Sequence, residues 1–396
     1  MGAASAPTFI IMAYRIIDNG AALAEFCQAA LAQEIVAVDT EFVWRNTYYP
    51  KFALLQIAWN EDNCVLIDPL AIEDKAPLAQ LMEAPGVKKV FHAAFNDIPI
   101  IERWANCHVC NIGDTIVAAG FANLTARLSL AKLFATQMGL VLTKTETRSD
   151  WLQRPLSDAQ LEYAGDDVAK LVALYQILVE KVEEAGNLAF YNEEMEQRSQ
   201  PGAYDEMSLD ECWLRVSRSP FIHFTKQDYA VLSRLAAWRE GTARAEDLPR
   251  NAVFRDEWLV QAAIKHPYTQ KEVAALPGIW SKLAKLRGEA VAKVVSAAMK
   301  LQPQDWPDLS QVLFDRRIVK QRSDRVVALM NKRAEARGID PMLLGSHRAA
   351  QDFVLAANSQ EKLSKTRLMN GWCHELLAPA IDDIAEEYYK KRMMPR

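Results

Sequence analysis

Apolar residues in the first half of the chain follow the periods of strands and helices. The segment 35–43, IVAVDTEFV, is rich in β-branched residues and predicts a strand, and the AALAEFCQAALAQ stretch before it predicts an amphipathic helix. FALLQIAW and CVLIDP predict two more strands, in an antiparallel meander with the first. KKVFHA and a short HVCNI segment would extend this mixed sheet through helical crossovers. The pattern therefore predicts an α/β domain over residues 12–190.

Helical periodicity covers the short segment FNDIPIIERWA and the long stretch 157–185. A charged connector rich in turn residues follows, and beyond it the chain shows only short amphipathic helices. Proline-containing breaks at Leu248-Pro249, His266-Pro267 and Pro277-Gly278 separate these helices. The pattern therefore predicts a helical region beyond this connector.

Composition favours an intracellular protein with real hydrophobic cores. Half of the 396 residues are hydrophobic, but no apolar stretch approaches the length that a bilayer requires, and no secretory signal is present. Cys107 and Cys110 form a C-x-x-C without a second pair at zinc-ribbon spacing, so free thiols are the favoured interpretation over a metal or redox site. We expect a cytoplasmic location and no membrane partner.

Charge is distributed unevenly along the chain. Residues 1–200 carry 15 Lys and Arg against 26 Asp and Glu, whereas residues 201–396 carry 31 against 25. The basic second half would supply non-specific attraction to phosphates, although a solvated helical surface explains the same modest excess.

One tyrosine and four acids in three separated segments carry the candidate chemistry. Asp39 and Glu41 are two apart on a predicted strand and would project to the same side. Asp97 lies near the start of a predicted helix, and Tyr163 and Asp167 lie one helical turn apart. Converging carboxylates must take up protons or bind metal, and acids without Cys or His favour Mg²⁺ or Mn²⁺. Two such ions suit attack on a phosphodiester, so the residues indicate a nuclease.

Each of these short motifs is weak in isolation. An isolated Asp-x-Glu is most often two solvated acids, and a lone Tyr163 would be a core helix tyrosine. Tyr14 and Asp18 match the same Tyr-x-x-x-Asp spacing, but they lie at a predicted strand-to-turn junction and are interpreted as structural. Asp166 points about 100° away from Asp167 on a helix, so we expect it to be solvated. The order of the segments carries the argument.

The segments around these residues carry a family resemblance. VDTEF followed by TYYPKFALLQIAW, then VFHAAFND and NIGDTIVAAGF, and finally TRSDWLQRPLSDAQLEYAGDDV stand in the order of known motifs. Over roughly residues 12–185 the chain resembles the ribonuclease D family, in the tyrosine branch of the DEDD 3′→5′ exonucleases. WREGTARAEDLP and VAALPGI resemble the helicase-and-RNase-D C-terminal (HRDC) domain. A second, weaker example covers about 303–385, where any five-helix domain is the alternative.

The resemblance implies a ribonuclease-H-like (DnaQ-like) exonuclease domain over residues 12–190, followed by two all-α, HRDC-like helical bundles over residues 220–300 and 303–386. It implies two divalent ions, one held by Asp39 with Asp167 and one mainly by Asp39, Glu41 and Asp97, with Tyr163 orienting the attacking water. A phenol with a pKa near 10 is a poor base, so positioning is the expected role. The implied partner is RNA, especially tRNA precursors with short 3′ extensions, and a monomer without an obligate protein partner is expected.

Substrate contacts are less specified by the sequence. Phe42 and Tyr48 follow the first acids and would stack on the terminal base, or else pack against the sheet. His92 would reach phosphate or be a satisfied core histidine, and Arg148 would approach the backbone or pair with an acid. Two other functions remain open, a DNA 3′→5′ exonuclease with the same acids and a catalytically silent RNA-binding scaffold.

Overall fold

The computed structural model describes residues 14–141, 146, 149–216, 224–309, 312 and 314–391. The chain divides into two compact units. Unit 1 draws on Met1–Val43, Phe52–Tyr204 and Gln321–Lys391, and unit 2 on Trp44–Lys51, Asp205–Lys320 and Arg392–Arg396. The predicted boundaries 12–190, 220–300 and 303–386 remain a prediction, and residues 321–391 cluster with the unit that contains the sheet.

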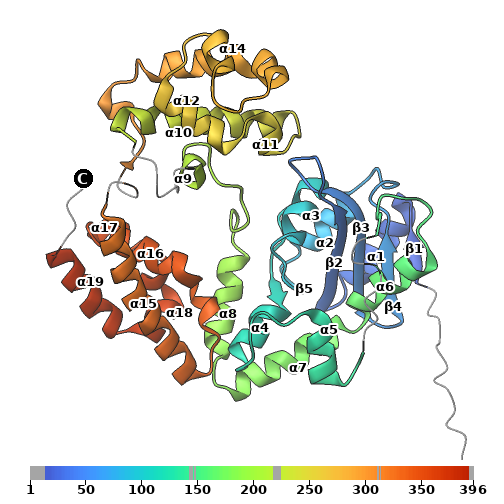
Figure 1. Ribbon diagram of the computed structural model, residues 1–396. Coiled ribbons are helices and arrows are strands. Elements are labelled where there is room, and N and C mark those ends of the chain that lie inside the picture. The colour runs from blue at the N-terminus through green and yellow to red at the C-terminus, as the bar shows by residue number, and fades with distance from the viewer. Residues whose placement is uncertain are drawn as a thin grey trace, which may run out of the picture. The chain divides into compact units, whose positions relative to one another are not determined.

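A six-stranded mixed sheet forms the centre of unit 1, in the order β1-β4-β3-β2-β5-β6 (Figure 1). The pair β3 and β4 is antiparallel, as predicted, whereas β5 pairs in parallel with both β2 and β6, and β1 pairs in parallel with β4. The strands are β1 (Arg15–Ile17), β2 (Ile35–Val43), β3 (Lys51–Asn60), β4 (Asn63–Ile67), β5 (Lys88–Phe91) and β6 (Ile112–Asp114).

The last strand begins later than the HVCNI segment predicted. Asn111 has a left-handed φ of 49°, which interrupts an extended run, so β6 starts at Ile112. Val109 from the predicted strand is still fully buried in the core. The apolar pattern therefore located the segment correctly but not its strand.

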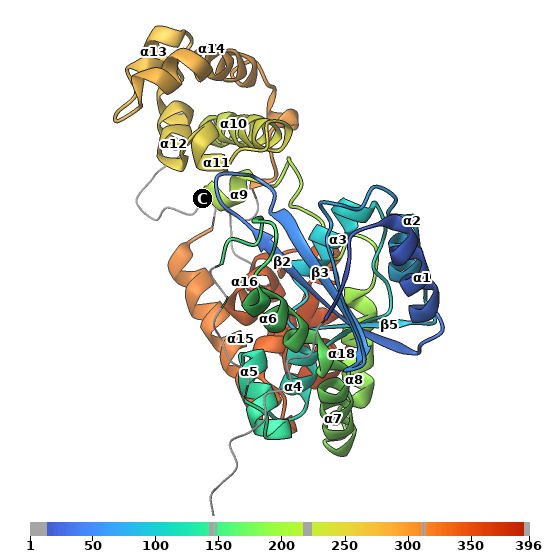
Figure 2. The same ribbon diagram turned by 90° about the vertical axis from the view of Figure 1, so that its right-hand side faces the viewer.

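Two hydrophobic clusters cover opposite faces of the sheet. Val36 and Val38 pack with helices α1 (Gly20–Ala30), α2 (Ala76–Glu83) and α3 (Asp97–Ala105), in what we call the α1–α3 core. Ala53, Leu54 and Leu66 pack with Trp151 and with Ala164 of α6 (Asp158–Ala169), in what we call the α6 core. Figure 2 shows α1 and α2 on one side of the sheet and α6 on the other. Successive side chains of β2 therefore enter two different cores.

The remaining helices of unit 1 follow the predicted helical periodicity. The long stretch 157–185 forms two helices, because the chain leaves helical geometry at Lys170, which caps both. The helices are α4 (Thr115–Phe121), α5 (Leu130–Leu133), α7 (Leu171–Glu184) and α8 (Leu188–Arg198), then α15 (Arg316–Arg337), which crosses the unit boundary, α16 (Ser346–Ala356), α17 (Gln360–Leu363), α18 (Gly371–Leu377) and α19 (Ala380–Lys390). Single π or 3₁₀ turns occupy η1 (Phe134–Met138), η4 (Pro341–Leu344) and η5 (Arg367–Met369).

Unit 2 is helical apart from the segment 44–51, which connects β2 to β3. Its core gathers buried aliphatic residues around Trp213, Phe254 and Trp258. The helices are α9 (Trp213–Val216), α10 (Lys226–Ala245), α11 (Arg250–Val253), α12 (Asp256–Lys265), α13 (Gln270–Ala274) and α14 (Ser281–Ala298), with a 3₁₀ turn at η2 (Pro303–Asp305). The predicted α/β domain followed by helical bundles is thus confirmed as a fold class.

Candidate metal and catalytic centre

Strand β2 places two acids on the face opposite its core valines. Val36 and Val38 enter the α1–α3 core, so the alternate positions Asp39 and Glu41 point toward the side that α6 covers. Both side chains are partly buried there. The period-two pattern of this strand is therefore what presents two carboxylates together.

Helix α6 supplies the third acid and the tyrosine. It begins with a capping box in which Ser157 and Gln160 satisfy each other's backbone N–H groups. Tyr163 and Asp167 follow at a spacing of four and share one face, and a hydrogen bond joins their side chains. The predicted placement of this pair on a single helix is confirmed.

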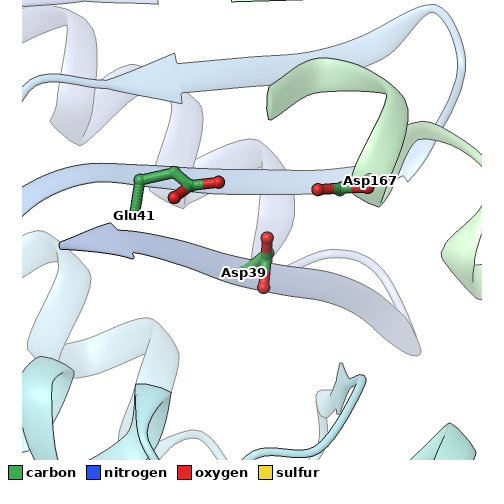
Figure 3. A group of neighbouring side chains, drawn as sticks. All are labelled: Asp39, Glu41 and Asp167. Carbon is green, nitrogen blue, oxygen red and sulfur yellow. The ribbon is translucent and has the colours of Figure 1, made fainter. Parts of the chain in front are cut away.

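Three carboxylates converge between β2 and α6. Asp39, Glu41 and Asp167 each offer an oxygen that lies within 4.8 Å of the other two (Figure 3). All three are hard oxygen ligands of the kind that Mg²⁺ and Mn²⁺ prefer. The donor set therefore fits a divalent cation.

Asp97 lies beside this group but is held separately. It is the first residue of α3, is 7% exposed, and accepts a hydrogen bond of 2.5 Å from Thr40 Oγ1. Thr40 lies between the two acids of β2 and so points to the opposite face of the strand. Strand alternation thus explains why the fourth acid reaches the site from the α3 side and not with the other three.

Asp114 supports the segment that carries Asp97, a role that the sequence did not predict. Its carboxylate accepts hydrogen bonds of 3.1 Å from the backbone N–H groups of both Ala93 and Ala94. Ala93 has a left-handed φ of 64°, so these bonds stabilise the turn that leads from β5 into α3 and Asp97. The acid-threonine pair Asp114-Thr115 was the available signal.

Burial, together with repulsion between the carboxylates in this cluster, raises the pKa values of Asp39 and Glu41, and burial raises that of Asp97. Burial, followed by the charges of Asp97, Asp167 and Glu41, raises the pKa of Asp39 well above its usual range. Burial and the charges of Asp167 and Asp97 raise the pKa of Glu41 to about 8. Burial also raises the pKa of Asp97 to about 6, against the lowering effect of the Thr40 hydrogen bond. Without a cation this site holds protons at neutral pH.

Comparison with known proteins gives the family. Residues 14–183 match the 3′-5′ exonuclease domain family, and residues 228–295 match the HRDC domain family. Ribonuclease D of Desulfotalea psychrophila is 31% identical over 362 residues, which cover 91% of this chain and 96% of that protein. The chain belongs to the ribonuclease D family.

A solved structure agrees with this assignment. The crystal structure of Escherichia coli RNase D, described as an exoribonuclease involved in structured RNA processing, has a TM-score of 0.85 and 30% identity, and the match covers 95% of this chain and 100% of that one. A protein from Bifidobacterium adolescentis shares the fold at a TM-score of 0.66 and 19% identity. The chain is thus a ribonuclease D-type enzyme, a 3′-5′ exonuclease hydrolase. Within the described residues, no helix combines the length and apolarity needed to cross a membrane.

The residues predicted to contact substrate in this ribonuclease D-type enzyme do not share one environment in the structure. Phe42 packs against the α1–α3 core, on the strand face away from Asp39 and Glu41. His92 is half-buried, and its Nδ1 lies 2.8 Å from Thr115 Oγ1. Arg148 lies outside the described residues. Roles in substrate binding remain predictions for all of them.

Tyr48 lies in unit 2 and is only 8% exposed. Its hydroxyl donates to Glu240 and accepts hydrogen bonds from Arg250 Nη2 at 2.8 Å and Arg244 Nε at 3.2 Å. Arg244 and Arg250 are therefore engaged with Tyr48 and Glu240 within unit 2. A stacking role for Tyr48 stays a prediction that no contact here supports.

The structure corrects the expectation that Asp166 is only solvated. Asp166 is not simply solvated, because Tyr14 donates a hydrogen bond of 2.7 Å to its Oδ1.

All six cysteines are free thiols, including Cys107 and Cys110. The Sγ of Cys110 lies 3.1 Å from the carbonyl oxygen of Glu83. Cys107 and Cys110 thus form no disulfide, and the absence of a metal or redox role for the C-x-x-C stays a prediction.

Proposed function

We propose that this enzyme is a 3′→5′ exoribonuclease that removes nucleoside 5′-monophosphates from RNA 3′ ends with two divalent ions. The observation that carries the proposal is the convergence of Asp39, Glu41 and Asp167 within 4.8 Å, with Asp97 beside them. Asp39 and Asp167 would hold one ion, and Asp39, Glu41 and Asp97 would hold the other. Bound Mg²⁺ or Mn²⁺ supplies a water of lowered pKa and neutralises charge on the attacking and leaving oxygens.

Tyr163 acts in this proposal as an orienting group and not as a base. Burial, then the charges of Asp167, Glu41 and Asp39, and the hydrogen bond to Asp167 all raise its pKa. The phenol therefore keeps its proton at neutral pH and donates a hydrogen bond to Asp167, while its oxygen can accept a hydrogen bond from a nucleophilic water and so orient it. Its ring packs 6.0 Å from Trp151 in the α6 core, which limits its rotation.

We infer that the substrates are RNAs with short 3′ extensions, tRNA precursors above all, and that the enzyme works as a cytoplasmic monomer. Support comes from a 30% identical relative aligned over its full length and described as an exoribonuclease involved in structured RNA processing. The HRDC-like bundle of unit 2 would add electrostatic affinity for the RNA backbone.

The decisive experiment uses a 5′-labelled tRNA with a few extra 3′ nucleotides, beside an all-DNA strand of equal length. Each is incubated with Mg²⁺, Mn²⁺ or EDTA. A metal-dependent ladder that shortens from the 3′ end of the RNA alone is the expected result. Equal loss of the DNA strand would replace the proposal with a DNA exonuclease, and no cleavage of either would favour an RNA-binding scaffold.

Variants of the acids test the assignment of the site. Asp39→Asn and Asp167→Asn should each lower turnover by at least about 10²-fold with the fold retained, since each removes a ligand charge. Tyr163→Phe should cost less, because only the orienting hydroxyl is lost. Glu162→Gln is the matched control, an exposed acid on the same helix, and should retain full activity. Wild-type rates in Asp39→Asn would rule out the metal assignment.

A further inference from the structure

Helix α6 must keep a fixed rotation about its axis and a fixed distance from the sheet for Asp167 to lie near Asp39 and Glu41 of β2. Tyr163 and Asp167 point to the acids of β2, and the residues between them, Ala164 to Asp166, contact other parts of unit 1. Ala164 is fully buried in the α6 core. The contacts of this short inner stretch therefore decide how close the helix lies to the sheet.

Tyr14, directly before β1, makes two contacts with this stretch. Its hydroxyl donates a hydrogen bond of 2.7 Å to Asp166 Oδ1, across 152 positions of sequence. Its ring lies so close to Gly165 that a Cβ built there would overlap the ring carbons. Cys64 Sγ on β4 also lies 3.7 Å from the Gly165 carbonyl oxygen, so β1 and β4 both approach the helix at this glycine.

The glycine is costly for the helix by itself. Glycine inside a helix is less favourable than alanine by about 0.5–1 kcal/mol. Here the absent side chain makes room for the Tyr14 ring, which joins the same cluster as Tyr163 and Trp151. The ring limits the approach of α6 to the sheet edge, and the hydrogen bond to Asp166 limits its rotation.

We propose that Tyr14 is a positioning residue for the metal centre, acting through Gly165 and Asp166 to set the orientation of Tyr163 and Asp167. This inference rests on the proposed function. Asp166 precedes Asp167 directly, so a helix released from Tyr14 changes the direction of the Asp167 carboxylate relative to Asp39 and Glu41. Loss of a residue that orients a metal ligand lowers metal affinity or activity about 10- to 100-fold.

The hydrogen bond is tested with Tyr14→Phe, which removes the donor, and Asp166→Ala, which removes the acceptor, in the full chain. Binding of Mn²⁺ alone is measured by electron paramagnetic resonance, together with turnover of the labelled RNA and its Mg²⁺ dependence. We expect each variant to weaken Mn²⁺ binding and to lower kcat by about tenfold, with KM for RNA unchanged. The double variant should be no worse than either single variant, because both remove one interaction.

Tyr388→Phe is the matched control. It also removes one hydroxyl hydrogen bond of a buried tyrosine, to the Arg322 carbonyl oxygen at 3.3 Å, in a helix far along the chain from α6. It should lower thermal stability to a similar extent and leave Mn²⁺ binding unchanged. A merely structural role of Tyr14 would give the same pattern for Tyr14→Phe, and that result would overturn the inference.

The steric contact between the Tyr14 ring and Gly165 is tested by enlarging residue 165 and shrinking residue 14. Gly165→Ala should lower Mn²⁺ affinity and kcat by about tenfold in the wild-type background. It should cost clearly less in a Tyr14→Leu background, because the smaller side chain frees room for the new methyl group. Gly241→Ala on α10 is the control, since a Cβ there meets nothing within 4 Å. A fully active Gly165→Ala variant, or an equal loss from Gly165→Ala in the wild-type and Tyr14→Leu backgrounds, would overturn the steric part.

Failure of the inference can be told apart from failure of the proposed function. If the wild-type protein binds Mn²⁺ but cuts neither RNA nor DNA, the function fails, and the Mn²⁺ comparison of the variants still decides the role of Tyr14. If the wild-type protein binds no Mn²⁺, both fail. Wild-type cleavage with unaltered Tyr14→Phe binding and kcat would overturn the positioning role alone.

Discussion

Among single residues, Glu41 gives the clearest test of the proposed metal centre. Burial and the charges of Asp167 and Asp97 raise its pKa from 4.5 to about 8, so the metal-free folded protein holds a proton there that the unfolded chain has lost. Because the folded state then binds more protons, the free energy of unfolding falls as pH rises from about 4.5 to about 8. A bound divalent cation removes this loss by stabilising the ionised form.

We therefore expect metal-free protein to be less stable at pH 8.5 than at pH 6, by about 1–3 kcal/mol from this site. Urea unfolding in EDTA measures the difference, and Mg²⁺ should reduce it. Glu41→Gln should lose less stability over the same range, whereas the exposed control Glu162→Gln should behave as wild type. Equal or greater stability of the wild-type protein at pH 8.5 in EDTA would contradict the assignment.

At the scale of elements, the close contact between α4 and the turn η4 links the exonuclease fold to residues 321–391. Gly120 on α4 is fully enclosed, and a Cβ built there would lie 2.7 Å from Leu343 Cδ1. The Asp340 backbone N–H donates to the Gly120 carbonyl oxygen at 2.8 Å, and Asp340 Oδ2 accepts from the Ala126 N–H at 2.7 Å. The C-terminal helical segment 321–391 is thus packed against α4 and hydrogen-bonded to Gly120 and Ala126.

Gly120→Ala should destabilise unit 1 by about 1–3 kcal/mol, because the methyl group overpacks this contact. Thermal unfolding followed by circular dichroism measures the effect. Gly241→Ala is the control with open space around its Cβ, and it should be neutral or stabilising by up to about 1 kcal/mol. A stabilised Gly120→Ala variant would show that the two elements do not pack as described.

At the scale of the whole molecule, the segment 44–51 belongs to a different unit from the strands on both sides of it. Asp247 Oδ1 accepts hydrogen bonds of 3.0 Å from the backbone N–H groups of Tyr48 and Tyr49. Although burial opposes it, hydrogen bonding from Arg250 and Tyr48 lowers the pKa of Glu240 to about 2. The Tyr48 hydroxyl is therefore held by an ionised, buried carboxylate.

Tyr48→Ala should release this segment and let the backbone at its two tryptic sites, the exposed residues Arg45 and Lys51, enter the protease active site. We expect cleavage there to be at least about tenfold faster than in the wild type, because a buried aromatic contact of about 3 kcal/mol is lost. Limited trypsinolysis with mass spectrometry measures the rate. Tyr388→Ala, a buried tyrosine in another part of the chain, should leave these sites protected. Unchanged cleavage in Tyr48→Ala would mean that Tyr48 does not hold the segment.

The sequence predicted the elements that local periodicity encodes. Segment 35–43 forms a strand, and its alternation alone puts Asp39 and Glu41 on one face. Tyr163 and Asp167 share a helix, as their spacing requires. The same alternation, applied to Thr40 and Phe42, would also have assigned these two residues to the opposite face, where Thr40 meets Asp97 and Phe42 meets the core.

By itself, then, the sequence determined the class of fold, the family and the acids of the proposed metal centre, because periodicity and motif order are local properties of the chain. Only the tertiary structure decided the contacts between distant positions. Tyr14 lies against Gly165 and Asp166, and Tyr48 lies against Glu240, through pairings across more than 150 residues. No local pattern specifies such contacts, because they depend on how the sheet and the bundle bring distant segments together.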